Sequence, residues 1–192
     1  MPKLRRKTKR PAIFLDRDGV INASPEHRYV AHWDQFHFLP GTLEALRRLN
    51  QNRQIVIVVS NQSGVGRKVL SRIHLAEITQ KMLQAVRSSG GWIRAVYYCT
   101  HHPENDCACR KPRVGLLKKA ARQFSIDLSR SFMVGDTETD ILMAHSAGCR
   151  SVLALSGKQT RSSARHLTVA PDQIAENLLE AVRWILREQR SP

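Results

Sequence analysis

The 192-residue sequence has no long hydrophobic run. No apolar stretch approaches the roughly 18 residues that a membrane-spanning helix needs, and the N-terminus lacks the apolar segment of a secretory signal. These absences predict a cytoplasmic protein with no membrane partner. Hydrophobic residues still make up 42% of the chain, which is enough for the sizeable core of one globular domain.

Acidic residues are scarce. Only 16 Asp and Glu accompany 31 Lys and Arg, and the formal net charge is +15. Six of these basic residues lie within residues 1–10, which contain no acidic and no aromatic residue. We expect residues 1–10 to form a disordered, solvated tail and residues 11–192 to form a single domain. Attraction of the tail to nucleic acid is the less favoured alternative, because no aromatic residue or folded motif accompanies it.

Cysteine is also infrequent, with four residues in the chain, three of which lie close together. Cys99, His101, Cys107 and Cys109 form a Cys₃His set that is typical of a structural, tetrahedral zinc site. A disulfide is the alternative, but a cytoplasmic chain disfavours it and the third thiol argues for metal. Bound zinc would make this loop rigid, so that Arg110 and Lys111 project from a fixed support.

The order of apolar runs and amphipathic segments predicts an α/β fold with a parallel sheet. Five strands are expected, at residues 12–15, 55–59, 95–98, 132–134 and 151–155. Helices are expected at residues 42–50, 71–86, 114–124 and 139–147, and a final helix is expected to begin at Pro171. Ile174 and Leu178 would belong to the apolar stripe of this last helix.

Polar side chains follow the expected strands. In an open parallel sheet the carboxyl ends of the strands meet at one edge, where ligands bind. The residues gathered there would be Asp16 and Asp18, Ser60 and Asn61, Arg110 and Lys111, and Asp136 and Asp140. Turn formation is the alternative for the first pair and helix capping for Asp140. Clustered carboxylates need a cation among them, and oxygen ligands favour Mg²⁺, so we expect a magnesium site that faces a phosphate.

These motifs resemble those of the haloacid dehalogenase superfamily of phosphatases. The shared features are Asp16-x-Asp18-Gly19-Val20, a hydroxyl residue after the second strand, Lys111-Pro112 and Gly135-Asp136-x-x-x-Asp140. Asp-Arg-Asp-Gly-Val-Ile-Asn, Ser-Asn-Gln-Ser-Gly and the Cys-x-His…Cys-x-Cys-Arg-Lys-Pro loop are similar to the branch of heptose bisphosphate and histidinol phosphatases. The resemblance implies a doubly wound parallel sheet of the lidless subclass, with a zinc-bound loop.

The resemblance also implies a role for each motif residue. Asp16 would attack phosphorus and form an aspartyl-phosphate, and Asp18 would act as general acid and then general base. Asp16, the Asp18 carbonyl and Asp136 would hold Mg²⁺. Ser60 and Lys111 would bind the oxygens of the transferring phosphoryl group, and Asp140 would orient Lys111 or the metal site.

The expected substrate is a small phosphorylated sugar, with heptose 1,7-bisphosphate favoured and its 7-phosphate removed. Histidinol phosphate or another phosphomonoester is one alternative, and a polynucleotide end-phosphatase or nucleic-acid-binding protein that uses the basic tail is the other. Residues 23–29 and Thr137 depart from the usual heptose pattern, which leaves the sugar open. We expect a monomer, and nucleic acid is the disfavoured partner. The residues predicted to contact substrate are Arg17, Ser24, His27, Asn61, Gln62, Ser63, Arg110 and Thr137.

Overall fold

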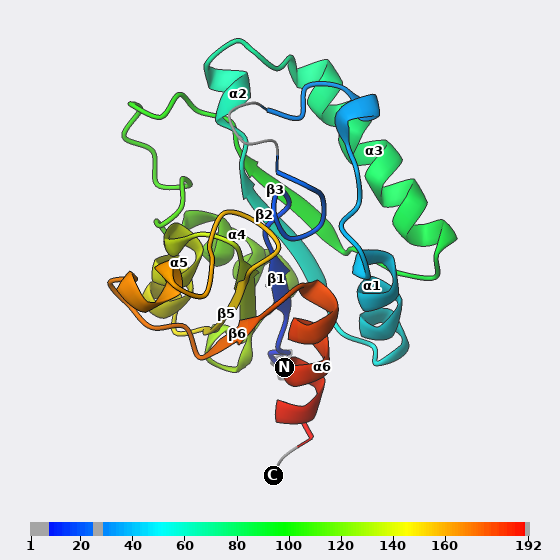
Figure 1. Ribbon diagram of the computed structural model, residues 1–192, viewed down its shortest axis with the longest axis vertical. Coiled ribbons are helices and arrows are strands. Elements are labelled where there is room, and N and C mark those ends of the chain that lie inside the picture. The colour runs from blue at the N-terminus through cyan, green and yellow to red at the C-terminus, as the bar shows by residue number, and fades with distance from the viewer. Residues whose placement is uncertain (1–7, 25–28, 191–192) are drawn as a thin grey trace, which may run out of the picture.

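A single sheet of six parallel strands forms the centre of the computed structural model, which describes residues 8–24 and 29–190 (Figure 1). The strands are β1 (Ile13–Leu15), β2 (Val56–Asn61), β3 (Ala95–Cys99), β4 (Phe132–Gly135), β5 (Arg150–Ala154) and β6 (Gln173–Ala175). Their order is β3-β2-β1-β4-β5-β6. This is the doubly wound order, and it puts a crevice at the carboxyl ends of β1 and β4, where the winding direction reverses.

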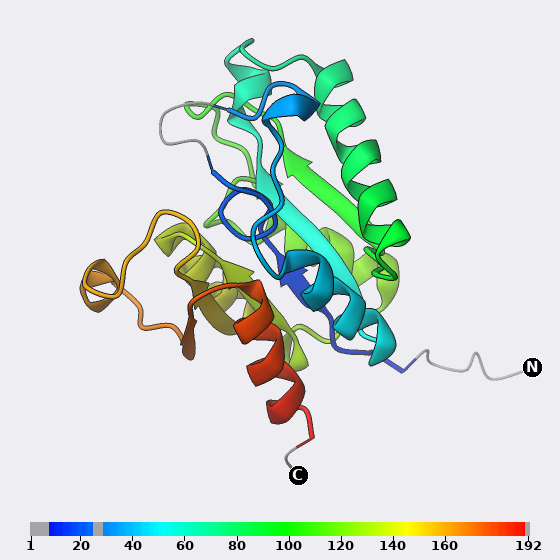
Figure 2. The same ribbon diagram turned by 45° about the vertical axis from the view of Figure 1, so that its right-hand side comes forward.

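Helices cover both faces of the sheet (Figure 2). They are α1 (Thr42–Gln51), α2 (Ser63–Gly66), α3 (Arg72–Ser88), α4 (Gly115–Phe124), α5 (Glu138–Ala147) and α6 (Leu178–Glu188), with short 3₁₀ turns at Trp33–Gln35, Leu128–Arg130 and Ser163–His166. Alternate residues of β1 separate the two layers. Ile13 and Leu15 pack with α1, α3 and α6, whereas Phe14 packs with α4 and α5.

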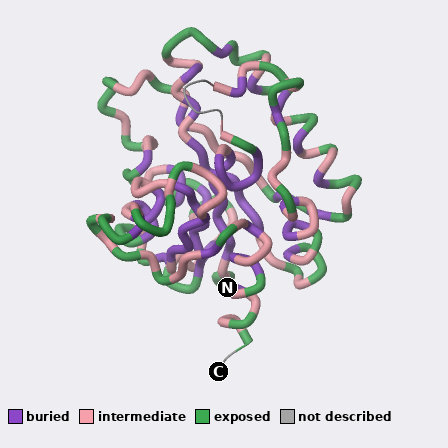
Figure 3. Tube along the Cα trace, viewed as in Figure 1, coloured by how far each residue is buried: buried purple, intermediate pink, exposed green. Residues whose placement is uncertain are grey.

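The central strands are the most deeply buried part of the molecule (Figure 3). All three residues of β1 are fully buried, as expected for a parallel strand covered on both faces. Cys149 is also buried, in the layer formed with α4 and α5. None of the helices in the described part of the chain combines the length and the hydrophobicity that a membrane-spanning segment needs.

The expected helix from Pro171 is wrong at its start. Residues Gln173–Ala175 form the sixth strand, β6, and the helix begins only at Leu178. Ile174 therefore packs beside Leu153 of the neighbouring strand rather than on a helical stripe. The side chain of Asn177 accepts a hydrogen bond from the Glu180 N–H at 3.1 Å and so caps the helix. Three residues are too few for a strand pattern to be visible in the sequence.

Candidate active site

Three carboxylates meet at the carboxyl edge of the sheet. Asp16 directly follows β1 and Asp136 directly follows β4, and these strands are neighbours, with Leu15 opposite Val134. Asp140 lies in the first turn of α5. Side-chain oxygens of all three aspartates lie within 4.8 Å of one another, and all three residues are buried. The strand order thus brings Asp16 to two acids that lie far along the chain from it.

Lys111 is the cation closest to this cluster. Its Nζ lies 2.8 Å from Asp16 Oδ2 and donates a 2.6 Å hydrogen bond to Asp140 Oδ1. Burial alone would lower the pKa of Lys111, but the charges of Asp140 and Asp16 raise it well above its usual value. The side chain is therefore a fixed positive charge, and Asp140 orients it toward Asp16.

Asp136 forms no ion pair with any residue that the structure describes, and the Lys111 charge offsets only a small part of the rise in its pKa. Burial, followed by the charges of Asp16 and Asp140, raises the pKa of Asp136 to about 7. Its Oδ2 accepts a hydrogen bond from the Lys158 backbone N–H at 3.0 Å. Gly19 makes this packing possible, because a Cβ there would lie 2.3 Å from Asp136 Oδ2. Since three buried carboxylates share one lysine, the donor set suits a hard divalent cation such as Mg²⁺.

We expect Mg²⁺ binding to be pH-dependent. A protonated Asp136 cannot ligate the ion, so proton and metal compete as the pH falls through about 7. The apparent Mg²⁺ affinity should therefore fall by up to about tenfold per pH unit below about 7 and become constant above about 8. Calorimetric Mg²⁺ titration at about pH 6, 7 and 8 measures this. Equal affinity at all three values would contradict the assignment.

Asp18 is held as a carboxylate by Arg17. The guanidinium donates to Asp18 Oδ1 at 2.8 Å and to Oδ2 at 3.0 Å, and the amides of Asn22 and Gln62 donate at 2.9 and 2.7 Å. Burial raises the pKa of Asp18, but the Arg17 charge and these hydrogen bonds lower it below its usual value overall. In this position Asp18 is a ready proton acceptor.

Two residues predicted to contact substrate lie elsewhere. Arg17 is fully buried behind Asp18, with its guanidinium 5.8 Å from the centre of the Tyr98 ring. Gln62 is buried as well and donates to Asp18 and Ser60. Both side chains position Asp18 rather than line the cavity, and nothing in the sequence distinguishes these two roles. His27 lies outside the described residues.

A cavity of about 390 Å³ opens in front of the carboxylates. Ten of the residues predicted from the sequence line this cavity: Asp16, Asp18, Ser24, Ser60, Asn61, Ser63, Arg110, Lys111, Asp136 and Thr137. Asn61 also fixes the loop that contains Lys111, because its Oδ1 accepts a hydrogen bond from the Lys111 backbone N–H at 3.1 Å. Thr137 Oγ1 donates to Asp140 Oδ2 at 2.6 Å. One cavity thus collects residues from the ends of four strands.

The sequence analysis missed four residues that line this cavity: Tyr29, Val30, Thr139 and Lys158. Lys158 could have been found, because it lies four residues past the end of β5 at Ala154, on the loop that leaves the carboxyl end of that strand. Tyr29 carries no such signal. Its hydroxyl lies 3.1 Å from Ser63 Oγ, and only the tertiary fold brings the two together.

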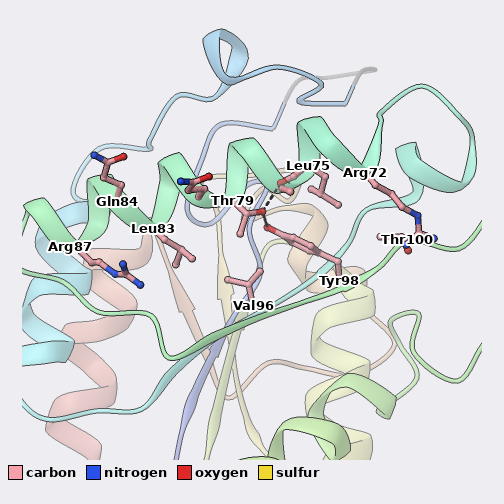
Figure 4. Close-up of a pocket in the computed structure, with 11 residues that line it drawn as sticks. Arg72, Leu75, Thr79, Leu83, Gln84, Arg87, Val96, Tyr98 and Thr100 are labelled. Carbon is pink, nitrogen blue, oxygen red and sulfur yellow. Dashed lines mark hydrogen bonds between the residues drawn. The ribbon is translucent and has the colours of Figure 1, made fainter.

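A larger cavity of about 770 Å³ lies between α3 and β3 (Figure 4). Its lining includes Leu75, Leu83 and Val96, and the Tyr98 hydroxyl lies 2.9 Å from Thr79 Oγ1 across it. Among the described residues, no carboxylate lines this cavity. Because the expected phosphoryl transfer needs a nucleophile, we assign the chemistry to the smaller cavity, which holds the carboxylates.

The Cys₃His set is brought together as predicted. Cys99 Sγ lies 3.6 Å from Cys107 Sγ, and His101 Nδ1 lies 3.2 Å from Cys109 Sγ. All four ligand atoms lie within 4.8 Å of one another. These separations fit a tetrahedron around one zinc ion, whose bonds to sulfur are about 2.3 Å long. The thiols are free and form no disulfide.

Comparison with known proteins defines the class. A family model described as HAD-hydrolase-like matches residues 108–181. Relatives more than 30% identical over most of both chains carry the name of a phosphatase. The chain therefore belongs to the haloacid dehalogenase-like hydrolases, and it is a phosphatase.

Three of the similar proteins are named as heptose bisphosphate phosphatases. D-glycero-beta-D-manno-heptose-1,7-bisphosphate 7-phosphatase of Pasteurella multocida is 40% identical over 154 residues, covering 77% of this chain and 83% of that protein. D-glycero-D-manno-heptose-1,7-bisphosphate 7-phosphatase of Thermosynechococcus vestitus is 39% identical over 190 residues, covering 92% and 95%. The D,D-heptose 1,7-bisphosphate phosphatase of B. bronchiseptica, solved with magnesium and phosphate, superposes with a TM-score of 0.86 at 34% identity, covering 93% of this chain and 99% of that one.

Proposed function

We propose that the protein is a Mg²⁺-dependent phosphomonoesterase that removes the 7-phosphate of D-glycero-D-manno-heptose 1,7-bisphosphate. The observation that carries this proposal is the cavity that joins Asp16, Asp18, Asp136 and Lys111. Its small volume suits a phosphorylated sugar better than a polymer. The names of the similar proteins support the choice of sugar.

The reaction begins with attack by Asp16. A carboxylate oxygen forms a bond to phosphorus while the bond from phosphorus to the sugar oxygen breaks, which gives an aspartyl-phosphate. Lys111 lies 2.8 Å from Asp16 and offers its charge to the transferring oxygens. Ser60 lines the same cavity and supplies a hydroxyl donor. Asp16, the Asp18 carbonyl and Asp136 would hold Mg²⁺, which would neutralise further negative charge on the transferring group.

Asp18 moves the protons of the two steps. As the sugar oxygen departs it takes a proton from Asp18, and Asp18 then removes a proton from the water that cleaves the aspartyl-phosphate. The contacts with Arg17 favour the carboxylate form that the second step needs. For the first step, Asp18 must be protonated in the complex with substrate.

Arg110 and Lys158 are suited to the part of the substrate that does not react. Both line the cavity, and neither is one of the aspartates that carry the reaction. Arg110 also donates to the His101 carbonyl, which ties it to the Cys₃His loop. A second phosphate carries up to two negative charges, and these cations would attract it. A bisphosphate therefore fits this cavity better than a monophosphate does.

Zinc in the Cys₃His loop would act on structure rather than on chemistry, because four protein ligands leave no open position. Cys107→Ser is expected to lower the zinc content from about one ion per chain to well below half. Activity should fall as well, because Arg110 and Lys111 lose their support. Elemental analysis together with thermal unfolding measures both effects. Cys149→Ser, outside the loop, is the matched control, and unchanged zinc in Cys107→Ser would contradict the site.

Phosphate release from three substrates in parallel tests the proposed function. Heptose 1,7-bisphosphate, histidinol phosphate and a 3′-phosphorylated oligonucleotide are compared with Mg²⁺ present and after chelation. We expect kcat/KM of at least about 10⁴ M⁻¹s⁻¹ for the bisphosphate and loss of activity on chelation. A preference for either alternative would overturn the choice of sugar. Full activity after chelation would overturn the role of the metal.

A further inference from the structure

Five arginines line a groove between α1 and α6, away from the carboxylates. The groove has a volume of about 500 Å³ and is lined by Arg47, Arg48, Gln51, Asn52, Arg183, Leu186, Arg187 and Arg190. Among the described residues, no acidic side chain is part of this lining. This surface, with its five arginines, is the arginine groove. Like charges repel, so their concentration on one concave surface favours an anionic partner.

The arginine groove lies at the opposite end of the sheet from Asp16. Helix α1 ends at Gln51, just before β2 begins at Val56, so its last turn is at the amino ends of the strands. Helix α6 lies beside α1, and its C-terminal end points the same way (Figures 1 and 2). A ligand in this groove would leave the catalytic cavity open.

The N-terminal part of the chain adjoins the groove. Arg10 Nη2 donates a hydrogen bond to the Arg53 carbonyl at 3.3 Å, and Arg190 Nη2 donates to Asn52 Oδ1 at 3.3 Å. Arg10 and Arg53 thus extend the basic surface beyond the groove itself.

Helix stability explains only part of this pattern. Arg48 and Arg187 lie in the last turns of α1 and α6, where a cation interacts favourably with the helix dipole. Arg48 also pairs with Glu44. Arg47, Arg183 and Arg190 lie on the same surface, but neither a place in the last helical turn nor an ion pair like that of Arg48 accounts for them.

We propose that the arginine groove, together with the adjoining Arg10 and Arg53, binds the phosphodiester backbone of a nucleic acid, without reading its sequence. Guanidinium groups match phosphate oxygens through paired N–H donors, and a concave basic surface follows a charged backbone. An anionic membrane is the weaker fit, because a membrane-bound surface also needs apolar side chains. The large hydrophobic residues exposed in the described part of the chain are Val69, Ile73 and Trp92, and none of them is on α1 or α6.

Fluorescence anisotropy of a labelled RNA of about 20 nucleotides, titrated with the full-length protein, tests this proposal. We expect a Kd of about 10⁻⁶ M at about 50 mM salt that weakens steeply as salt is added. The variant Arg47→Gln/Arg183→Gln/Arg190→Gln should bind at least about tenfold more weakly, with the slope of log K against log salt reduced by about 3. Arg72→Gln/Arg122→Gln/Arg165→Gln removes the same charge from other exposed positions and is the matched control, with an expected change below about threefold.

Each outcome decides the proposal. No measurable binding at about 50 mM salt, or equal losses in the two triple variants, would overturn it. Binding to vesicles of equal parts phosphatidylglycerol and phosphatidylcholine without RNA binding would also overturn it, in favour of a membrane surface. Phosphate release is measured on the same samples, and neither triple variant should change it. A failure of the RNA-binding proposal is therefore distinguishable from a failure of the proposed phosphatase reaction.

Discussion

Asp16→Asn is expected to lower kcat by on the order of 10⁴-fold or more. The amide oxygen of Asn is a poor nucleophile and cannot form the aspartyl-phosphate. Asn also keeps the volume of the side chain, so the fold around β1 should persist. Steady-state phosphate release at saturating Mg²⁺ measures the effect.

Two controls separate nucleophilic attack from other roles of Asp16. Asp172→Asn changes an aspartate that binds Ser151 Oγ at 2.9 Å, beside the start of β5, and it should leave turnover unchanged. Raising the Mg²⁺ concentration should not rescue Asp16→Asn. Recovery at high Mg²⁺ would reduce Asp16 to a metal ligand, and turnover near that of the wild type would show that another residue attacks phosphorus.

Lys111→Met is expected to lower both activity and stability. Loss of the charged donor should cost about 10²–10³-fold in kcat. Asp16 and Asp140 then remain buried without their shared cation, and breaking such a pair costs roughly 3–5 kcal/mol of unfolding free energy. The measurement is denaturant unfolding in the presence of a chelator, beside the turnover assay.

A double variant tests the cause of the instability. In Lys111→Met/Asp140→Asn, one of the two unpaired charges is removed, so part of the lost stability should return while turnover stays low. The penalty of the single variant should also shrink as the pH falls, because protonation neutralises the unpaired carboxylates. Equal stability of the single and double variants at about pH 8 would show that lost packing, and not charge, is responsible.

The sequence predicted where the chemistry lies because the relevant residues follow strands. Asp16 and Asp136 each come directly after an apolar strand, and parallel strands put such positions at one edge. The Cys₃His set was predicted from residue types and close spacing alone. Local patterns of this kind do not depend on knowing which loops pack together.

The rest of the site depends on contacts that leave no local pattern. Arg17 lies between two aspartates in the chain, yet its side chain is buried, where it binds Asp18. Tyr29 reaches the cavity only through the path of a loop. The strand β6 is three residues long and was assigned to a helix. In each case tertiary packing, rather than periodicity or propensity, decides the outcome.

The most direct test of the account is to find the phosphoryl group on Asp16. Asp18→Asn is mixed with an aryl phosphate, whose phenolate leaves without a proton, and the reaction is quenched in acid for peptide mass mapping. The amide that replaces the Asp18 carboxylate cannot take a proton from water, so the phospho-enzyme should accumulate with the phosphoryl group on Asp16. We also expect a burst of phenolate whose concentration equals that of the enzyme. A burst with the phosphoryl group on another residue, or with none on the protein, would contradict the central claim.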